Sequence, residues 1–138
     1  MITQKAGTIL LNIKTKKVGL IFRKTLNDYT FPKGHLEKGE TLQECAIRET
    51  EEETLRANHL LINEEIYTEK YITPSGEKVE NHLYIAIDDG PTSKNIAIED
   101  REELIWVDPT EVLELLTYED LKKIWEEIYP KIFEILGL

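Results

Sequence analysis

The sequence is poor in cysteine and has no long hydrophobic runs. Its single cysteine, Cys45, excludes an internal disulfide framework and a cysteine-rich zinc site. No apolar run approaches the roughly 20 residues that a membrane-spanning helix needs, and no signal-peptide core follows Met1. We therefore expect a cytoplasmic protein without a membrane partner.

Positive charge is also scarce. The 17 Lys and Arg residues face 27 Asp and Glu residues, which leaves a formal net charge of -10. Binding along a nucleic-acid backbone needs an extended basic surface, so we expect no long nucleic acid as a partner, although this composition still allows a small cationic pocket. The 138 residues are enough for one core and show no repeat or linker. They predict a single domain over residues 1–138, as a monomer or weak dimer.

Strands are predicted on both sides of one central helix. They are expected at residues 6–13, 17–23, 29–31, 59–73, 78–88 and 104–107. Helices are expected at residues 42–55, at 110–116 and from a cap at Thr117 onward, where Pro130 should kink or divide the last one. The segments 33–40 and 89–100 are expected to be loops. This order predicts an α+β fold with a mixed sheet and helices on its faces.

The predicted helix 42–55 has an apolar stripe that turns acidic along its length. At about 100° per residue, both halves of the stripe lie on one side, so the carboxylates point towards the body of the protein. Carboxylates at i, i+3 and i+4 repel one another, and a hard divalent cation such as Mg²⁺ relieves that repulsion. A solvated charge run is the alternative, and we assign it to Glu51 on the other side. The stripe consists of Leu42, Cys45, Ala46, Glu49, Glu52 and Glu53.

Candidate phosphate ligands lie just before this helix. Lys33 and His35 flank Gly34, and Arg23 ends the predicted strand 17–23. Lys33 can supply a point charge and Arg23 a fork-shaped donor, whereas an ordinary exposed position is the alternative for His35. Cations beside an inward-facing acidic helix indicate a site for a metal ion and a phosphate.

The spacing from Gly34 to Glu53 resembles the Nudix box, G-x5-E-x7-R-E-U-x-E-E-x-G-U, in which U is aliphatic. Three later positions depart from it: Thr50 and Arg56 stand at aliphatic positions, and Leu55 replaces a glycine that commonly ends the helix. The resemblance implies a Nudix-type α/β/α sandwich with a mixed central sheet and a catalytic loop-helix-loop. The anchors in register are Gly34, Glu40, Arg48, Glu49, Glu52 and Glu53.

The resemblance also implies a reaction, the hydrolysis of a diphosphate linked to another group, with Mg²⁺ or Mn²⁺ as cofactor. Glu52 and Glu53 would bind the metal, and Glu49 would be a third ligand or the general base. Arg48 would orient Glu49 through an ion pair, and the backbone at Gly34 would offer a carbonyl oxygen to the metal.

A further acidic ligand is implied ahead of the last strand. Many members of the family carry one about six positions before a tryptophan. Counting back from Trp106 gives Asp100, with Glu99 beside it and Glu103 nearer. We favour Glu99 or Asp100, and the count does not separate them.

The segment 30–35, TFPKGH, is similar to the W-x-P-K-G-H entrance of asymmetric diadenosine tetraphosphate (Ap4A) hydrolases. Their adenine-stacking aromatic residue makes Tyr118 the candidate here, with Tyr84 as a weaker one; half-buried core tyrosines are the alternative. The resemblance implies that a small nucleotide is the substrate and that Ap4A is cleaved to ATP and AMP. The alternatives are a nucleoside-triphosphate or RNA 5′-end pyrophosphatase, and a non-catalytic nucleotide-sensing module.

Overall fold

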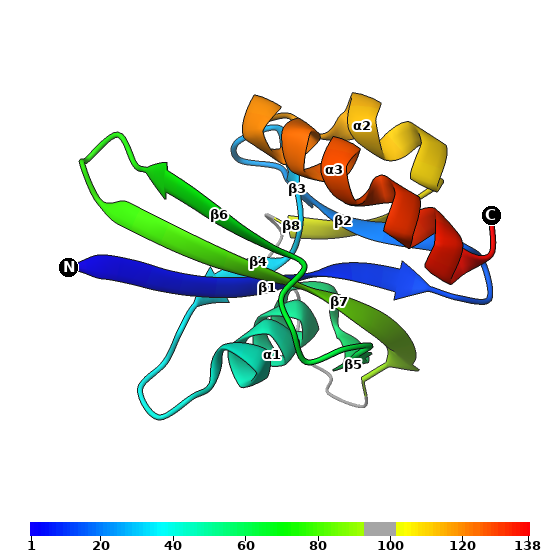
Figure 1. Cartoon of the computed structure of the whole chain (residues 1–138), viewed down its shortest axis with the longest axis horizontal. Helices are drawn as coiled ribbons and strands as arrows, with labels where there is room; N and C mark the ends of the chain where they lie inside the picture. The colour runs from blue at the N-terminus through cyan, green and yellow to red at the C-terminus, as the bar shows by residue number, and fades with distance from the viewer. Residues whose placement is uncertain (93–101) are drawn as a thin grey trace.

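A mixed sheet forms the centre of the computed structural model, which describes residues 1–92 and 102–138. Within these residues the sheet has eight strands, with α1 on one side and α2 and α3 on the other (Figure 1). The strands are β1 (Ile2–Asn12), β2 (Lys17–Arg23), β3 (Asp28–Thr30), β4 (Lys33–His35), β5 (Arg56–Leu60), β6 (Tyr67–Ile72), β7 (Lys78–Pro91) and β8 (Glu102–Val107). The helices are α1 (Leu42–Thr54), a 3₁₀ turn at Pro109–Glu111, α2 (Val112–Leu115) and α3 (Glu119–Leu136).

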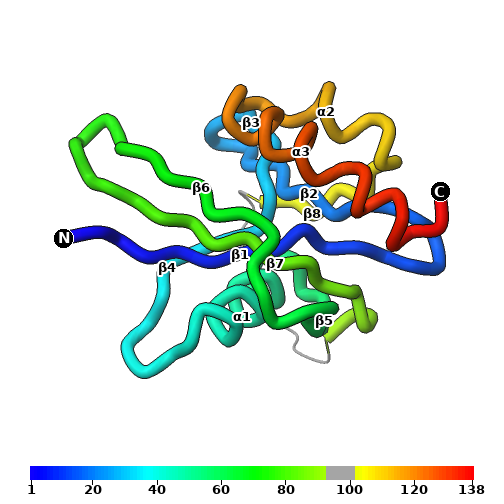
Figure 2. Tube along the Cα trace, viewed as in Figure 1, coloured from blue at the N-terminus to red at the C-terminus, as the bar shows by residue number. Residues whose placement is uncertain are grey.

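The long parallel pair of β1 and β7 runs through the middle of the sheet. Figure 2 shows the two strands side by side, and their register extends from Ile2 opposite Lys78 to Leu11 opposite Ile87. The remaining pairs are antiparallel: β2 and β4 pair with β1, β3 and β8 with β2, and β5 and β6 with β7. The sheet is therefore mixed, as the sequence predicted.

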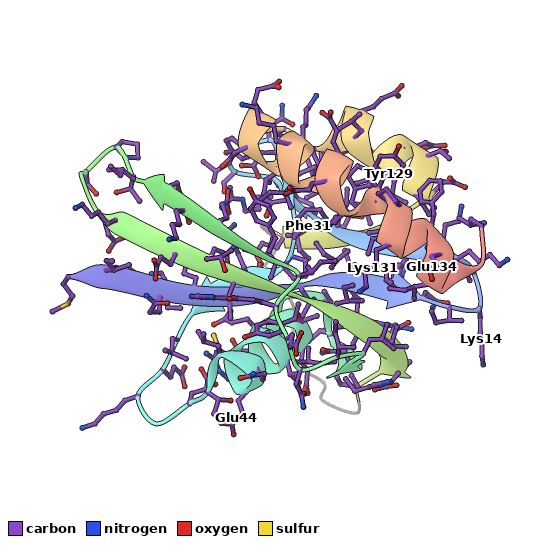
Figure 3. The ribbon with its side chains drawn as sticks, viewed as in Figure 1. Lys14, Phe31, Glu44, Tyr129, Lys131 and Glu134 are labelled. Atoms are coloured by element: carbon purple, nitrogen blue, oxygen red, sulfur yellow. The ribbon has the colours of Figure 1, made fainter. Side chains whose placement is uncertain are left out.

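The larger core lies between the sheet and α3. The buried side chains of α3 recur at three- and four-residue spacing, and they cover apolar residues of β1, β2 and β7. Phe31, labelled beneath α3 in Figure 3, packs against Trp125 with ring centroids 6.4 Å apart. A smaller core of Ala6, Cys45, Ala46 and Tyr84 lies under α1. In the described part of the chain, no helix is both long and apolar enough to cross a membrane.

The predicted α+β architecture is confirmed, whereas several predicted boundaries are wrong. The expected strand 59–73 is two strands, β5 and β6, because the 14-residue β7 is long enough to pair with each along a different part of its length. The expected loop 33–40 begins with β4, whose Gly34 pairs with Ala6 of β1. Three residues are too few to show a periodic pattern, so this strand had no sequence signal.

The helix α1 begins and ends close to where the sequence predicts. Thr41 and Glu44 form the predicted capping box. At the other end Leu55, which replaces the glycine of the box, itself adopts the left-handed conformation with φ 56° and ψ 30°. Its N–H donates to the Glu51 carbonyl at 2.8 Å. The helix therefore still ends in a left-handed turn, at a cost of about 1–2 kcal/mol because Leu55 has a Cβ.

The start of α3 differs from the prediction, and of the two alternatives for Pro130, a kink or a division of the helix, the division is wrong. Tyr118, not Thr117, is the N-cap residue, and the Thr117 hydroxyl instead accepts a hydrogen bond of 2.8 Å from the Tyr29 N–H. Pro130 does not divide the helix, which continues to Leu136. The buried side chains before and after Pro130 hold α3 against the sheet, and this packing outweighs the lost helix hydrogen bond.

We expect Pro130→Ala to raise the free energy of unfolding by about 1–2 kcal/mol. A proline inside a helix costs about 3 kcal/mol, of which its restriction of the unfolded chain returns a part. Pro130 is exposed, so alanine loses little packing. Circular dichroism should show Tm higher by roughly 3 °C or more. The neighbouring exposed control, Lys131→Ala, should stay within about 0.5 kcal/mol. An unchanged Tm for Pro130→Ala would contradict this account.

Candidate active site

The acidic half of the α1 stripe faces β4. The buried apolar half packs on β1, where the Thr50 hydroxyl hydrogen-bonds the Thr8 hydroxyl at 2.7 Å. This contact fixes the rotation of the helix. One turn further on, Glu53 accepts a hydrogen bond of 2.7 Å from the Lys33 backbone N–H. Glu49 is 16% exposed, whereas Glu52 remains 57% exposed at the outer edge of the stripe.

Arg48 ties several carboxylates together. Its guanidinium contacts Glu40 through two nitrogens, at 2.6 and 2.9 Å, and Glu49 at 2.8 Å. It also lies 3.3 Å from Glu52 and donates to the His35 carbonyl at 3.0 Å. The hydrogen bonds from Arg48 lower the pKa of Glu40 to about 2. Burial raises the pKa of Glu49, while Arg48 opposes that rise. Arg48 thus keeps Glu49 in a fixed position.

Gly34 and Glu49 are in direct contact. A Cβ placed on Gly34 would lie 2.1 Å from Cδ and 2.1 Å from Oε2 of Glu49. Only glycine leaves room for the Glu49 carboxylate at this point. The Gly34 carbonyl, a predicted metal ligand, accepts a weak hydrogen bond from the Cys45 thiol at 3.6 Å.

Two carboxylates lie close together where α1 meets β8, Glu53 from the helix and Glu102 from the strand. Burial is the main cause that raises the pKa of Glu53 to about 8, and the nearby Glu102 carboxylate adds to it. Glu102 was not among the residues that the sequence predicted. Strand alternation from Trp106 would have found it, since Glu102, Leu104 and Trp106 share one side of β8.

Of the acidic residues counted back from Trp106, the structure describes only Glu103. Glu103 is exposed, on the opposite side of β8 from Glu102 and on the same side as the buried Val107. Glu99 and Asp100 lie outside the described residues. Of the three acidic candidates taken from the count back from Trp106, the structure therefore places only Glu103, on the side of β8 opposite Glu102, and the favoured pair Glu99 and Asp100 stays a prediction.

A cavity of about 560 Å³ opens beside β4 and the start of α3. It brings Arg23, Lys33 and Tyr118 together, and the Lys33 Nζ lies 3.4 Å from the Thr30 hydroxyl. Burial lowers the pKa of Lys33, and the charge of Arg23 adds to that effect. The lining includes Lys5, Arg23, Lys33, Glu69, Tyr118 and Asp120.

The buried Asp28 carboxylate holds two residues of the cavity wall. It accepts two hydrogen bonds from Arg23, at 2.8 and 2.6 Å, and a third from the Tyr118 hydroxyl. Its side chain is only 1% exposed. Two of the Arg23 donors are thus already used, so Arg23 presents less of its fork than the sequence suggested. Tyr118 is 43% exposed and its hydroxyl is anchored, which leaves its ring at the cavity mouth.

Two predicted substrate-binding residues lie apart from this cavity. Tyr84 is 3% exposed and packs in the small core under α1. That position corresponds to the alternative of a core tyrosine. His35 is exposed at the end of β4, where its carbonyl accepts from Arg48.

The chain is similar to known proteins both in its sequence and in its fold. The family model described as NUDIX domain matches residues 1–129. The chain belongs to the Nudix family. A Caenorhabditis elegans Ap4A hydrolase in a binary complex superposes with a TM-score of 0.77 at 18% identity, covering 96% of this chain and 98% of that one.

Two further Nudix-type structures show the same fold. A NUDIX hydrolase from Nitrosomonas europaea superposes with a TM-score of 0.77 at 14% identity, covering 95% of this chain and 90% of that one. A MutT protein from Bacillus halodurans gives 0.67 at 23% identity, covering 92% and 82%. At these identities the likeness shows the fold, and family membership supports a nucleotide pyrophosphohydrolase.

The donor chemistry of this Nudix site fits a divalent cation. Glu53 and Glu102 are two carboxylates held close enough to raise a pKa, a repulsion that a cation between them would relieve. Glu49 and Glu52 add oxygen donors from the same helix. Among residues 1–92 and 102–138, however, no three His, Cys, Asp or Glu side chains already converge into a metal site. Arg48 accounts for part of this, because it holds Glu49 and Glu52 on its own side.

We expect Gly34→Ala in this Nudix hydrolase to fold and to lose tenfold or more of its nucleotide hydrolysis. The new Cβ must displace the Glu49 carboxylate, and a shift of about 1 Å at a reacting group can cost a hundredfold. The matched control is Gly76→Ala, in an open turn with φ 88°. It should lose about 1–2 kcal/mol of stability and keep its activity. Equal activity losses in the two variants would argue against a specific role for the Gly34–Glu49 contact.

Proposed function

We propose that the chain hydrolyses a phosphoanhydride bond of a nucleoside polyphosphate, and that its substrate is Ap4A, cleaved asymmetrically to ATP and AMP. The observation that carries the proposal is the position of Lys33. Its backbone N–H holds Glu53 of the acidic helix, while its side chain lines the cavity below Tyr118. One residue thus joins a carboxylate site to a cationic cavity with an aromatic wall.

The acidic side of the site is proposed to bind the cofactor, Mg²⁺ or Mn²⁺. Glu52, Glu53 and Glu102 would hold it, with Glu49 as a further ligand or as the general base. A bound divalent cation neutralises phosphate charge and lowers the pKa of water. As the general base, Glu49 would accept a proton from water, and Arg48 would keep its carboxylate in place for that step.

The cavity is proposed to bind one nucleoside and its adjoining phosphates. Its volume of about 560 Å³ lies within the range of small-molecule sites. Tyr118 offers a ring for stacking and Lys33 a positive charge for phosphate. A base held in the cavity fixes how far each phosphate of the substrate lies from the carboxylates, so the same phosphate is attacked in every turnover. Because that phosphate is always at the same position counted from the bound base, the arrangement favours asymmetric cleavage.

A nucleoside-triphosphate pyrophosphatase is the second candidate. The cavity favours it in one respect, since its volume suits a single nucleoside and does not require a second one. A non-catalytic sensing module is disfavoured, because Glu49, Glu52 and Glu53 are all present.

The expected products of Ap4A with Mg²⁺ or Mn²⁺ are ATP and AMP in equal amounts. In heavy-oxygen water, mass spectrometry should find the label in only one of the two products, because water attacks one fixed phosphorus. Excess chelator should stop the reaction. Formation of two molecules of ADP would contradict asymmetric cleavage. Turnover of nucleoside triphosphates with none of Ap4A would favour the second candidate.

Tyr118→Ala should raise KM for Ap4A by roughly ten- to a hundredfold, since stacking on an aromatic side chain contributes about 1–3 kcal/mol per base. Tyr118→Phe keeps the ring and loses only the bond to Asp28, so its KM should rise less. Tyr129, labelled on the outer side of α3 in Figure 3, supplies the control: Tyr129→Ala removes an exposed ring outside the cavity lining and should leave KM unchanged. Steady-state kinetics measures all three, and an unaltered KM in Tyr118→Ala would place the base elsewhere.

A further inference from the structure

A buried carboxylate that the proposed chemistry does not use lies in the cavity wall. Glu69 is on β6, is 6% exposed and lines the cavity that also holds Lys33 and Tyr118. Its Oε1 accepts a hydrogen bond of 3.3 Å from Nδ2 of Asn81 on β7. Asp120, near the start of α3, faces it closely enough to hydrogen-bond. A buried carboxylate beside a second one is costly, so an apolar residue would serve better if only packing mattered.

An unsatisfied polar atom adjoins this pair. Oδ1 of Asn81 is fully buried and has no hydrogen-bond partner among the described residues. Most buried polar atoms in folded proteins are hydrogen-bonded, and exceptions call for a bound partner or a functional role. Glu69 and Asp120 therefore line the cavity as a polar pair, with Asn81 buried behind Glu69 and not fully hydrogen-bonded, and the mouth of the same cavity carries an aromatic ring.

We infer that Glu69, with Asp120, reads the hydrogen-bonding edge of the nucleobase that Tyr118 stacks on. This inference rests on the proposed function, which places a nucleoside in the cavity. When Glu69 is protonated, its carboxyl group presents a hydroxyl donor beside an acceptor oxygen, and the Asp120 carboxylate adds a further acceptor. Adenine carries the complement on its edge, an N1 acceptor beside the N6 amino donor. A pair without a proton only accepts, which suits the N1–H and N2 amino donors of guanine.

The protonation state of Glu69 therefore sets the base preference. Burial, with Asp120 next in importance, raises the pKa of Glu69 to about 7, and Asn81 and Lys33 oppose the rise. The charged and titratable groups that line the cavity with Glu69 are Arg23 from β2, Lys33 from β4, Lys5 from β1, Tyr71 from β6, Asp120 from α3 and Tyr118, the N-cap residue of α3. At pH values below its raised pKa, Glu69 keeps its proton and favours adenine. At pH values above that pKa, Glu69 loses the proton and tolerates guanine.

The test compares adenine with guanine at two pH values. Binding of AMP and GMP is measured by titration calorimetry, and kcat/KM by the hydrolysis of Ap4A and diguanosine tetraphosphate. In the wild type, the adenine-to-guanine ratio should fall at least about tenfold from pH 6 to pH 8, since the protonated fraction of a group with a pKa near 7 falls about tenfold. The pH dependence of the carboxylates on α1 acts on both nucleotides and cancels in the ratio.

Glu69→Gln should make that ratio independent of pH and keep it in favour of adenine, because an amide presents a donor and an acceptor at every pH. The exposed control Glu77→Gln should match the wild type. Asp120→Asn, an exposed substitution that should not disturb folding, removes a charge that raises the pKa of Glu69, so the change in the ratio should move to lower pH.

Three outcomes would overturn the inference: a wild-type ratio that does not change with pH, a pH profile of Glu69→Gln equal to that of the wild type, or no binding of either mononucleotide. Failure of the proposed function is a different result, in which the mononucleotides bind with the expected base preference but neither dinucleotide is hydrolysed. In that case the calorimetric titrations with AMP and GMP still test the role of Glu69 in base preference.

Discussion

The contact between β4 and α1 is the constraint on which the candidate site depends. This three-residue strand pairs with β1 in the sheet and also contacts the helix, with its Lys33 N–H on Glu53 and its Gly34 against Glu49. Two glycines make the approach possible. A Cβ on Gly7 of β1 would lie 2.1 Å from the Pro32 carbonyl oxygen, and a Cβ on Gly34 would enter the Glu49 carboxylate. Without both glycines, β4 could not approach β1 and α1 at the same time.

The acidic helix is divided electrostatically into two parts. Arg48 supplies positive charge to Glu40, Glu49 and Glu52, so these carboxylates are held without a metal ion. Glu53 is not paired with Arg48: it accepts a neutral backbone N–H, lies near the charge of Lys33 and faces a second carboxylate, and burial is the main cause that raises its pKa to about 8. A divalent cation bound there would therefore gain most at Glu53, because it would replace a proton rather than an arginine.

Much of this arrangement could be predicted from the sequence, because it is encoded by local patterns. The stripe on α1 and its capping box follow from residue spacing, and so does the order of strands and helices. Contacts between distant segments had no such signal. Strand β4 exists only through its pairing with β1, and the division between β5 and β6 follows from the length of β7.

Glu102 is an intermediate case between a local pattern and a distant contact. Alternation along β8 places its side chain with those of Leu104 and Trp106, but counting back from Trp106 by a fixed number pointed to residues ahead of the strand. Leu55 shows that packing can override a local sequence signal. Leu55 replaces a glycine that commonly ends the helix, yet the chain keeps the left-handed turn, because the packing of α1 and β5 outweighs a cost of about 1–2 kcal/mol.

The alternation of side chains along β4 connects the two halves of the site. Lys33 and Gly34 are consecutive, so their side-chain positions point in opposite directions, one into the cavity and the other onto α1. The distance between the cationic cavity and the carboxylates is thereby set by backbone geometry and not by flexible side chains. Tyr118 is held in the same frame, because Asp28 binds both its hydroxyl and Arg23. A nucleotide held between Tyr118 and Lys33 would therefore extend its phosphates along β4 towards Glu49 and Glu53, and the number of phosphates between base and carboxylates would be fixed by the fold itself.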